Sequence, residues 1–84
     1  FTNYMYIEIF TDYLINSDDV VGVFDLDNTT TNKFTNDFLN QKQKENKITY
    51  LVSDIPKSFI LMNDGSVYVV ELSSQILKKR FEII

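Results

Sequence analysis

Cysteine and histidine are both absent from this chain. Without them the protein forms no disulfide, offers no thiol nucleophile and no imidazole base, and lacks the side chains that hold zinc in most proteins. These absences exclude several common enzyme classes and fit a protein of the reducing cytoplasm. No motif implies a cofactor or a small-molecule substrate, and we expect neither.

Long apolar stretches are absent as well. No run approaches the ~20 residues that a membrane helix needs, and the first residues do not have the pattern of a signal peptide. We therefore expect a soluble, unexported protein without a membrane partner. Residues 1–4 precede Met5, which could be the initiator, so we expect an upstream extension or an expression remnant at 1–4 and a single domain over 5–84.

Glycine and proline are scarce, whereas apolar and aromatic residues are plentiful. Two glycines and one proline leave little room for a flexible linker. Of the 84 residues 44% are hydrophobic, including seven phenylalanines and five tyrosines. Because a domain of this size buries only about 60–65% of its unfolded surface, we expect part of this apolar material to lie between subunits of a homo-oligomer.

The net charge of −4 conceals a gradient along the chain. Residues 1–40 hold seven acids against one cation, whereas residues 41–84 hold seven cations against five acids. The cations gather in two clusters, Lys42, Lys44 and Lys47, then Lys78, Lys79 and Arg80. An acidic chain is a poor binder of polyanions as a whole, and lysines in the last turn of a helix also complement its dipole. On charge alone, solvated helix faces explain both clusters.

The first third of the chain has the pattern of three strands. Apolar residues alternate with polar ones over 5–10, and a second short strand is expected over 13–15. Residues 16–19 carry turn-forming side chains. Residues 20–26 are apolar on both faces, which predicts a strand at the centre of a sheet.

Further strands are expected in the second half. Residues 48–52 have the pattern of a strand, and residues 53–56 interrupt it. The apolar runs 59–62 and 67–70 flank Asn63-Asp64-Gly65, which is the clearest hairpin signal in the chain.

Two helices complete the expected elements. Phe34, Phe38 and Leu39 define a narrow apolar stripe, which predicts an amphipathic helix over about 29–46, capped by Asp27, Asn28 or a following threonine. This helix should pack one side on the sheet and leave its lysines in solvent. A short final helix should begin at Ser73 or Ser74 and turn one apolar side inward, formed by Ile76, Leu77, Phe81 and Ile84. The predicted fold class is therefore α+β, with a small, mostly antiparallel sheet.

The segment 20–30 resembles the first motif of haloacid-dehalogenase-type phosphatases, because Asp25 and Asp27 follow an apolar strand. In that chemistry the first Asp attacks phosphorus and the second protonates the leaving group. A further acidic pair must hold magnesium, but the later carboxylates stand singly, and the parent doubly wound sheet does not fit into 84 residues. We prefer a strand that ends in a turn or a helix cap, and we expect no catalytic residue.

The same segments also carry a resemblance to a second family. The chain from Met5 to Arg80 is similar to the small bacterial extracellular-matrix regulators, the RemA and RemB family, and lies closer to the RemB branch. The most specific pieces are Val21-Gly22-Val23-Phe24-Asp25, Pro56-Lys57-Ser58, Leu72-Ser73-Ser74 and Leu77-Lys78-Lys79-Arg80.

The resemblance implies a cytoplasmic, non-enzymatic protein with a compact α+β domain, related to LytTR-type DNA-binding domains, that assembles into a ring. RemA-type members bind DNA around such an assembly and promote transcription of biofilm-matrix genes. A ring repeats one modest basic patch many times, so weak phosphate contacts add together. Affinity for DNA would then depend on assembly.

The chain departs from the DNA-binding branch at two places. Asp19 stands where RemA-like sequences place an arginine, and residues 53–58 contain one cation where those sequences carry several. Two hypotheses follow, a regulator that contacts DNA and an oligomeric interaction module that binds only protein. For the first, the candidate phosphate contacts are Lys57, by its motif position, and Lys78, Lys79 and Arg80, by their charge.

Overall fold

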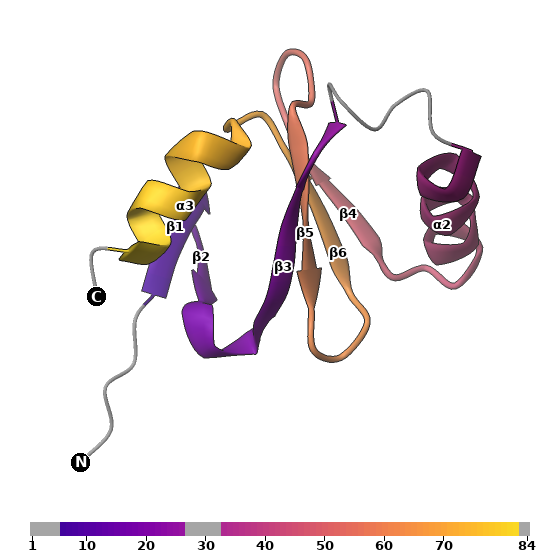
Figure 1. Ribbon diagram of the computed structural model, residues 1–84, viewed down its shortest axis with the longest axis horizontal. Helices are drawn as coiled ribbons and strands as arrows, with labels where there is room; N and C mark the ends of the chain where they lie inside the picture. Colours follow the sequence, from indigo (N-terminus) through magenta and orange to yellow (C-terminus); the bar gives the residue numbers. More distant parts are fainter. Residues whose placement is uncertain (1–5, 27–32, 83–84) are drawn as a thin grey trace.

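The computed structural model describes residues 6–26 and 33–82, and it has the α+β fold that the sequence predicts (Figure 1). Its elements in chain order are β1 (Tyr6–Phe10), β2 (Tyr13–Asn16), the 3-10 turn η1 (Ser17–Asp19), β3 (Val20–Asp25), α2 (Lys33–Lys44), β4 (Ile48–Leu51), β5 (Ser58–Met62), β6 (Val67–Val70) and α3 (Ser74–Glu82). The predicted caps of the first helix, Asp27, Asn28 and the following threonines, lie outside the described residues.

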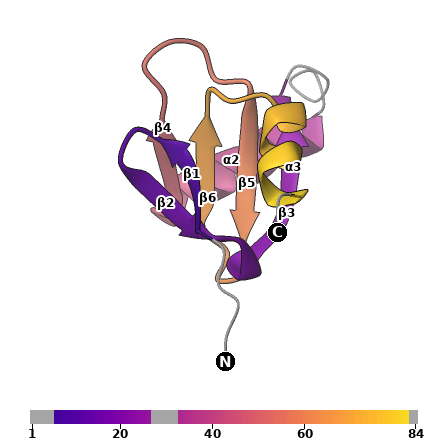
Figure 2. The ribbon, with the colours of Figure 1, turned by 90° about the vertical axis from the view of Figure 1, so that its left-hand side faces the viewer.

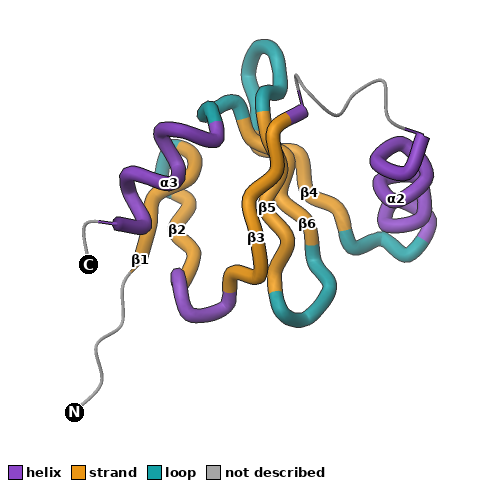
Figure 3. The backbone as a smooth tube through the Cα atoms, in the orientation of Figure 1, coloured by secondary structure: helices purple, strands orange, loops and turns teal. Residues whose placement is uncertain are grey.

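The strands form a two-stranded hairpin and a four-stranded sheet. β1 pairs antiparallel with β2, and the larger sheet has the order β3-β5-β6-β4. β5 runs antiparallel to both of its neighbours, while β4 runs parallel to β6 (Figure 3). β3 and β4 therefore run in the same direction at the two edges of the sheet, and the long connection that such strands need contains α2. The prediction of a mostly antiparallel sheet is confirmed.

The predicted hairpin of β5 and β6 is built by its turn residues. Gly65 has a φ of 89°, a conformation that L side chains rarely adopt, and its N–H donates to the Met62 carbonyl at 3.0 Å. The Asp64 carboxylate accepts the N–H of Ser66 at 2.9 Å. These local contacts explain why the turn could be recognised from sequence.

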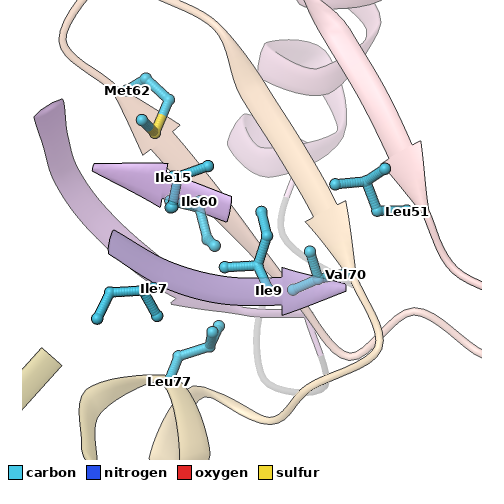
Figure 4. Packing of buried hydrophobic residues seen from close by; sticks show 8 residues of the cluster. All are labelled: Ile7, Ile9, Ile15, Leu51, Ile60, Met62, Val70 and Leu77. Carbon is cyan, nitrogen blue, oxygen red and sulfur yellow. The ribbon is translucent and has the colours of Figure 1, made fainter. Parts of the chain in front are cut away.

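The main core lies on one face of the sheet, beneath the β1–β2 hairpin and α3. Figure 4 shows its buried apolar side chains, which are Ile7, Ile9, Ile15, Leu51, Ile60, Met62, Val70 and Leu77. Seen from the side, the hairpin lies in front of the sheet and α2 lies behind it (Figure 2). The domain therefore has three layers, with the four-stranded sheet in the middle.

One buried serine joins the sheet to the last helix. Ser58, at the start of β5, is fully buried, and its hydroxyl donates to the Leu72 carbonyl at 2.5 Å. The helix itself begins as predicted, because Ser73 Oγ accepts the N–H of Ile76 at 3.2 Å. The end of β6 and the start of α3 are thus held against the start of β5.

The opposite face of the sheet carries a second, thinner core. Phe59, Val67 and Val69 are buried there, and Phe38 and Leu39 of α2 pack against them. No residue of α2 is buried, so this helix covers its face of the sheet incompletely. Lys42 was predicted to lie in solvent, but its side chain is only 16% exposed.

Two expectations about packing were wrong. β3 was predicted at the centre of the sheet, yet it lies at an edge and pairs only with β5 within the described sheet. Its Val21 is 62% exposed at an irregularity in the ladder, so its apolar character reflects an open surface and not a central position. Ile76 was predicted to face inward with Leu77, but it is 44% exposed.

A tyrosine pair predicts how stability responds to alkaline pH. The hydrogen bond with Tyr13, at 3.3 Å between the hydroxyl oxygens, and then partial burial raise the pKa of Tyr68 from 10.0 to about 12. The folded state therefore resists ionisation of the Tyr68 hydroxyl. The stability that the neutral hydroxyl contributes is complete below pH 10.0 and is lost as the pH rises through about 12. We expect Tyr68→Phe to lose less unfolding free energy over this range than the parent protein does.

Chemical denaturation at several alkaline pH values measures this effect. Tyr50→Phe is the control, because Tyr50 is an exposed tyrosine of β4. Equal alkaline losses in the parent protein and in both variants would show that the Tyr68 hydroxyl has no such role.

Candidate nucleic-acid interface

Lys57 occupies a backbone position that is fixed on both sides. Its N–H donates to the Val70 carbonyl at 2.9 Å, and its own carbonyl accepts the N–H of Leu26 at 2.9 Å. These bonds tie the residue to the ends of β6 and β3, while the side chain is exposed. Because the backbone of Lys57 is already fixed, contact between its ammonium group and a phosphate carries no entropic cost for ordering the loop.

The three consecutive cations of α3 do not form one exposed cluster of three. A helix turns about 100° per residue, so Lys78, Lys79 and Arg80 point in different directions. Lys78 and Lys79 are exposed. Arg80 is half-buried, and its Nη1 donates to the Glu8 carbonyl of β1 at 2.5 Å. The predicted basic cluster is therefore a pair of exposed lysines beside an arginine that joins α3 to the hairpin.

Arg80 also lines a shallow pocket between the hairpin and the end of β6. The pocket has a volume of about 210 Å³, and its walls include Glu8 and Glu71 as well as Arg80. The Glu71 carboxylate accepts a hydrogen bond from Ser53 Oγ at 3.2 Å. Because two acidic residues and one arginine line it, this pocket has no excess of positive charge.

Asp19 lies at the opposite end of β3 from Lys57. In the β3–β5 ladder, Val20 pairs with Met62 and Asp25 pairs with Ser58, so the ladder separates the two sites. The Asp19 carbonyl accepts the N–H of Asn63 at 2.8 Å. Asp19 thus has a structural contact with the β5–β6 turn, and its exposed carboxylate adds negative charge at that end of the molecule.

Aromatic side chains line an apolar groove between α2 and the edge of the sheet, which the sequence analysis missed. The groove has a volume of about 260 Å³ and is lined by Phe24, Phe34, Thr35, Phe38, Phe59 and Leu61. Phe24 stacks on Phe59 with ring centroids 4.9 Å apart. Phe34, in the first turn of α2, is 85% exposed. Its position four residues before Phe38 was visible in the sequence, but this spacing also fits a helix packed fully on a sheet.

Among the described residues, the structure does not bring together the acidic side chains that a phosphatase site requires. Asp25 ends β3 opposite Ser58, and its proposed partner Asp27 lies outside the described residues. Within residues 6–26 and 33–82, no three Asp or Glu side chains come together as a set that could hold a metal ion. Across the same residues, neither helix is long and apolar enough to span a membrane.

The comparison with known proteins agrees with the sequence resemblance. The chain is 32% identical over 80 residues to extracellular matrix regulatory protein B of Bacillus subtilis (strain 168), and the match covers 95% of this chain and 94% of that protein. No protein-family model matches the chain.

Proposed function

This chain belongs to the family of extracellular matrix regulatory protein B, and from that premise we propose that it is a non-enzymatic cytoplasmic regulator of the biofilm-matrix type. It works as a ring-shaped homo-oligomer in which every copy adds a few weak phosphate contacts to DNA. The similarity, at 32% identity over 95% of the chain, carries the proposal.

The apolar groove between α2 and β3 supports assembly, with a second copy of the chain as its occupant. Phe34 is 85% exposed there, and Val21 and Phe24 extend the apolar surface along β3, whose outer edge is unpaired in the described sheet. An exposed apolar patch beside an open strand edge is typical of a subunit interface. The acidic first half of the chain favours contact with the more basic second half of a neighbouring copy. Such head-to-tail contacts form a ring when the rotation from one copy to the next closes.

The exposed lysines support contacts with DNA phosphates. In the proposed interface Lys57, Lys78 and Lys79 each contact one phosphate, and Arg80 contributes less because it is bonded to β1. We expect the double variant Lys78→Ala/Lys79→Ala to bind duplex DNA more weakly and to lower the slope of log K against log salt by about 2 per subunit engaged, since each phosphate contact contributes about 1.

Fluorescence anisotropy of labelled DNA over a range of salt concentrations tests this prediction. Lys33→Ala is the matched control, because Lys33 is also an exposed lysine but lies in the first turn of α2. A loss of affinity in Lys33→Ala as large as that in the double variant, or no loss in either, would contradict the proposed interface.

A second candidate function is an oligomeric module that binds protein and no nucleic acid. The net charge of −4 and the exposed carboxylate of Asp19 favour it, because both repel phosphate. Assembly through apolar surfaces persists in salt, whereas DNA binding through lysines does not. A stable oligomer that fails to bind DNA even at low salt identifies this second function.

A further inference from the structure

The four-stranded sheet has two open edges that match in direction and length. Among the described strands, β3 pairs only with β5 and β4 pairs only with β6, so each outer strand has one unpaired side. Figure 2 shows β3 and β4 at opposite sides of the sheet, and both run in the same direction. The ladder of β3 is regular from Gly22 to Asp25, which gives it the same four-residue length as β4. The β4 strand of a second copy therefore fits beside β3 as a parallel strand.

The paired residues align in rows that cross all four strands. One row consists, in strand order, of Phe24, Phe59, Val69 and Tyr50. Phe59 and Val69 are buried in the middle of the row, whereas Phe24 is 41% exposed at one end and Tyr50 is 55% exposed at the other. Paired residues of neighbouring strands share a face of the sheet, so all four lie on the face that α2 covers in part. The row thus ends in an exposed aromatic side chain at each edge.

The direction of the backbone groups on the two edges follows from the bonds inside the sheet. The N–H of Leu26 points toward β5, because it donates to the Lys57 carbonyl at 2.9 Å. The Lys47 carbonyl points toward β6, because it accepts the N–H of Val67 at 2.8 Å. Backbone groups of successive peptides in a strand point alternately to its two sides. The residues whose backbone groups point out of the sheet therefore include Val23 on β3 and Ile48 and Tyr50 on β4.

These outward groups complement each other in one register. In a parallel pair, a residue bonds to the two neighbours of the residue that lies opposite it. With Val23 opposite Thr49 of a second copy, its backbone groups meet those of Ile48 and Tyr50. The same register places Tyr50 of that copy beside Phe24, so it also continues the aromatic row. Backbone direction and side-chain rows, which are separate observations, give the same alignment.

The starts of the two edge strands differ in charge. Asp18 and Asp19 directly precede β3, and both are exposed. Lys47 directly precedes β4, and like Lys42 it approaches the β5–β6 turn at Gly65. The charged groups around the start of β4 are three lysines and two carboxylates, namely Lys42, Lys44, Lys47, Glu45 and Asp64. In a parallel junction the two starts lie at the same end, so the acidic start of β3 meets a start of β4 that has a small positive excess.

We propose that β4 of one copy pairs in parallel with β3 of the next, with Tyr50 covering Phe24 and the apolar groove that Phe24 shares with Phe34. The proposal rests on the homo-oligomer of the proposed function and identifies the two surfaces that meet in it. The pairing extends the sheet from copy to copy, bonds the backbone groups of both open edges and buries the aromatic ends of the row. The occupant of the groove is a second copy, since the chain itself carries the matching edge.

The absence of cysteine from the chain allows a direct test by disulfide formation. In Val23→Cys/Thr49→Cys the two new side chains lie in one row at opposite edges of the same sheet, about 14 Å apart over three strand spacings, which is too far to bond within one copy. In the proposed junction they lie opposite each other on adjacent strands, within disulfide reach. After oxidation we expect a denaturing gel to show covalent dimers, trimers and larger species that a reductant converts to monomer.

The control is Leu14→Cys/Thr49→Cys, which has the same number of cysteines but places one on β2, where Leu14 is 57% exposed. It should not form the series of covalent species. If light scattering shows multimers, equal crosslinking in both double variants, or none in Val23→Cys/Thr49→Cys, overturns the junction and leaves assembly intact. A parent protein that stays monomeric overturns the assembly in the proposed function, and the junction with it.

Tyr50→Ser provides a second measurement that needs no cysteine. Because Tyr50 is exposed in the single chain, serine removes little packing from the subunit. We expect the protein concentration at half-assembly to rise about tenfold or more, since an aromatic contact between copies is lost. Tyr50→Phe keeps the ring and should assemble as the parent does. A Tyr50→Ser protein that is folded by circular dichroism and assembles at the parent's concentration contradicts the proposal.

Discussion

Replacing Phe34 with serine is expected to reduce the proposed homo-oligomer to monomers and, as a consequence, to lower the proposed affinity for DNA by about 10²–10⁴-fold. Phe34 is 85% exposed in the single chain, so serine removes little packing from the subunit itself. It does remove the most exposed aromatic group of the apolar groove, which in the proposed assembly is buried against the next copy. The DNA effect follows from the proposed function, in which the phosphate contacts of one subunit bind DNA weakly and add together only in the assembly.

Light scattering on Phe34→Ser measures the predicted loss of assembly, and circular dichroism confirms that the domain is folded. Phe34→Leu is the matched control, since leucine preserves an apolar side chain at the same position and should still assemble. A folded Phe34→Ser protein with the parent's oligomeric mass would show that this groove is not the subunit interface.

Replacing Leu77 with alanine is expected to lower the free energy of unfolding by about 2–5 kcal/mol. Leu77 is fully buried in the main core, where α3 meets the hairpin and the sheet. The loss combines the lost transfer of apolar atoms from water with the cost of the cavity that remains. Since a small domain is stable by only about 5–15 kcal/mol, this variant should approach the limit of folding at moderate temperature.

Urea denaturation of Leu77→Ala beside Ile76→Ala makes the comparison within one helix. Ile76 is the neighbouring residue and is 44% exposed, so its substitution should change stability by roughly 0.5 kcal/mol or less. If the two variants lost the same stability, α3 would not be oriented as described.

The local elements of this fold could be predicted because neighbouring residues determine them. The alternation before Phe10 produces β1, and the β5–β6 turn depends on Asp64 and Gly65 themselves. Ser73 caps α3 by a bond to a residue three positions later. Each of these contacts spans a few residues, so the pattern that encodes it is visible in the sequence.

The position of β3 could not be predicted in the same way. A strand that is apolar on both faces fits the centre of a sheet, and it fits equally an edge whose surface meets another chain. Val21 and Phe24 are the residues that decide between these cases, because the structure leaves both of them exposed. Sequence periodicity reports burial without identifying the partner.

The candidate site was only partly predictable for a related reason. Consecutive cations at the end of the sequence suggested one cluster, but Arg80 bonds to the carbonyl of Glu8, which lies 72 positions earlier in the chain. The approach of Lys42 and Lys47 to Gly65 likewise depends on where α2 packs on the sheet. Contacts of this length arise from tertiary packing, and no local pattern encodes them.

We propose that this protein contacts DNA only when it is assembled into a multimer. The most direct test is the fluorescence anisotropy of a labelled DNA duplex titrated with the protein at low and at near-physiological salt, with the oligomeric mass measured by light scattering on the same sample. We predict a stable multimer at both salt concentrations and DNA binding that weakens by orders of magnitude as salt is added. A protein that remains monomeric, or a multimer that binds no DNA even at low salt, would contradict the claim.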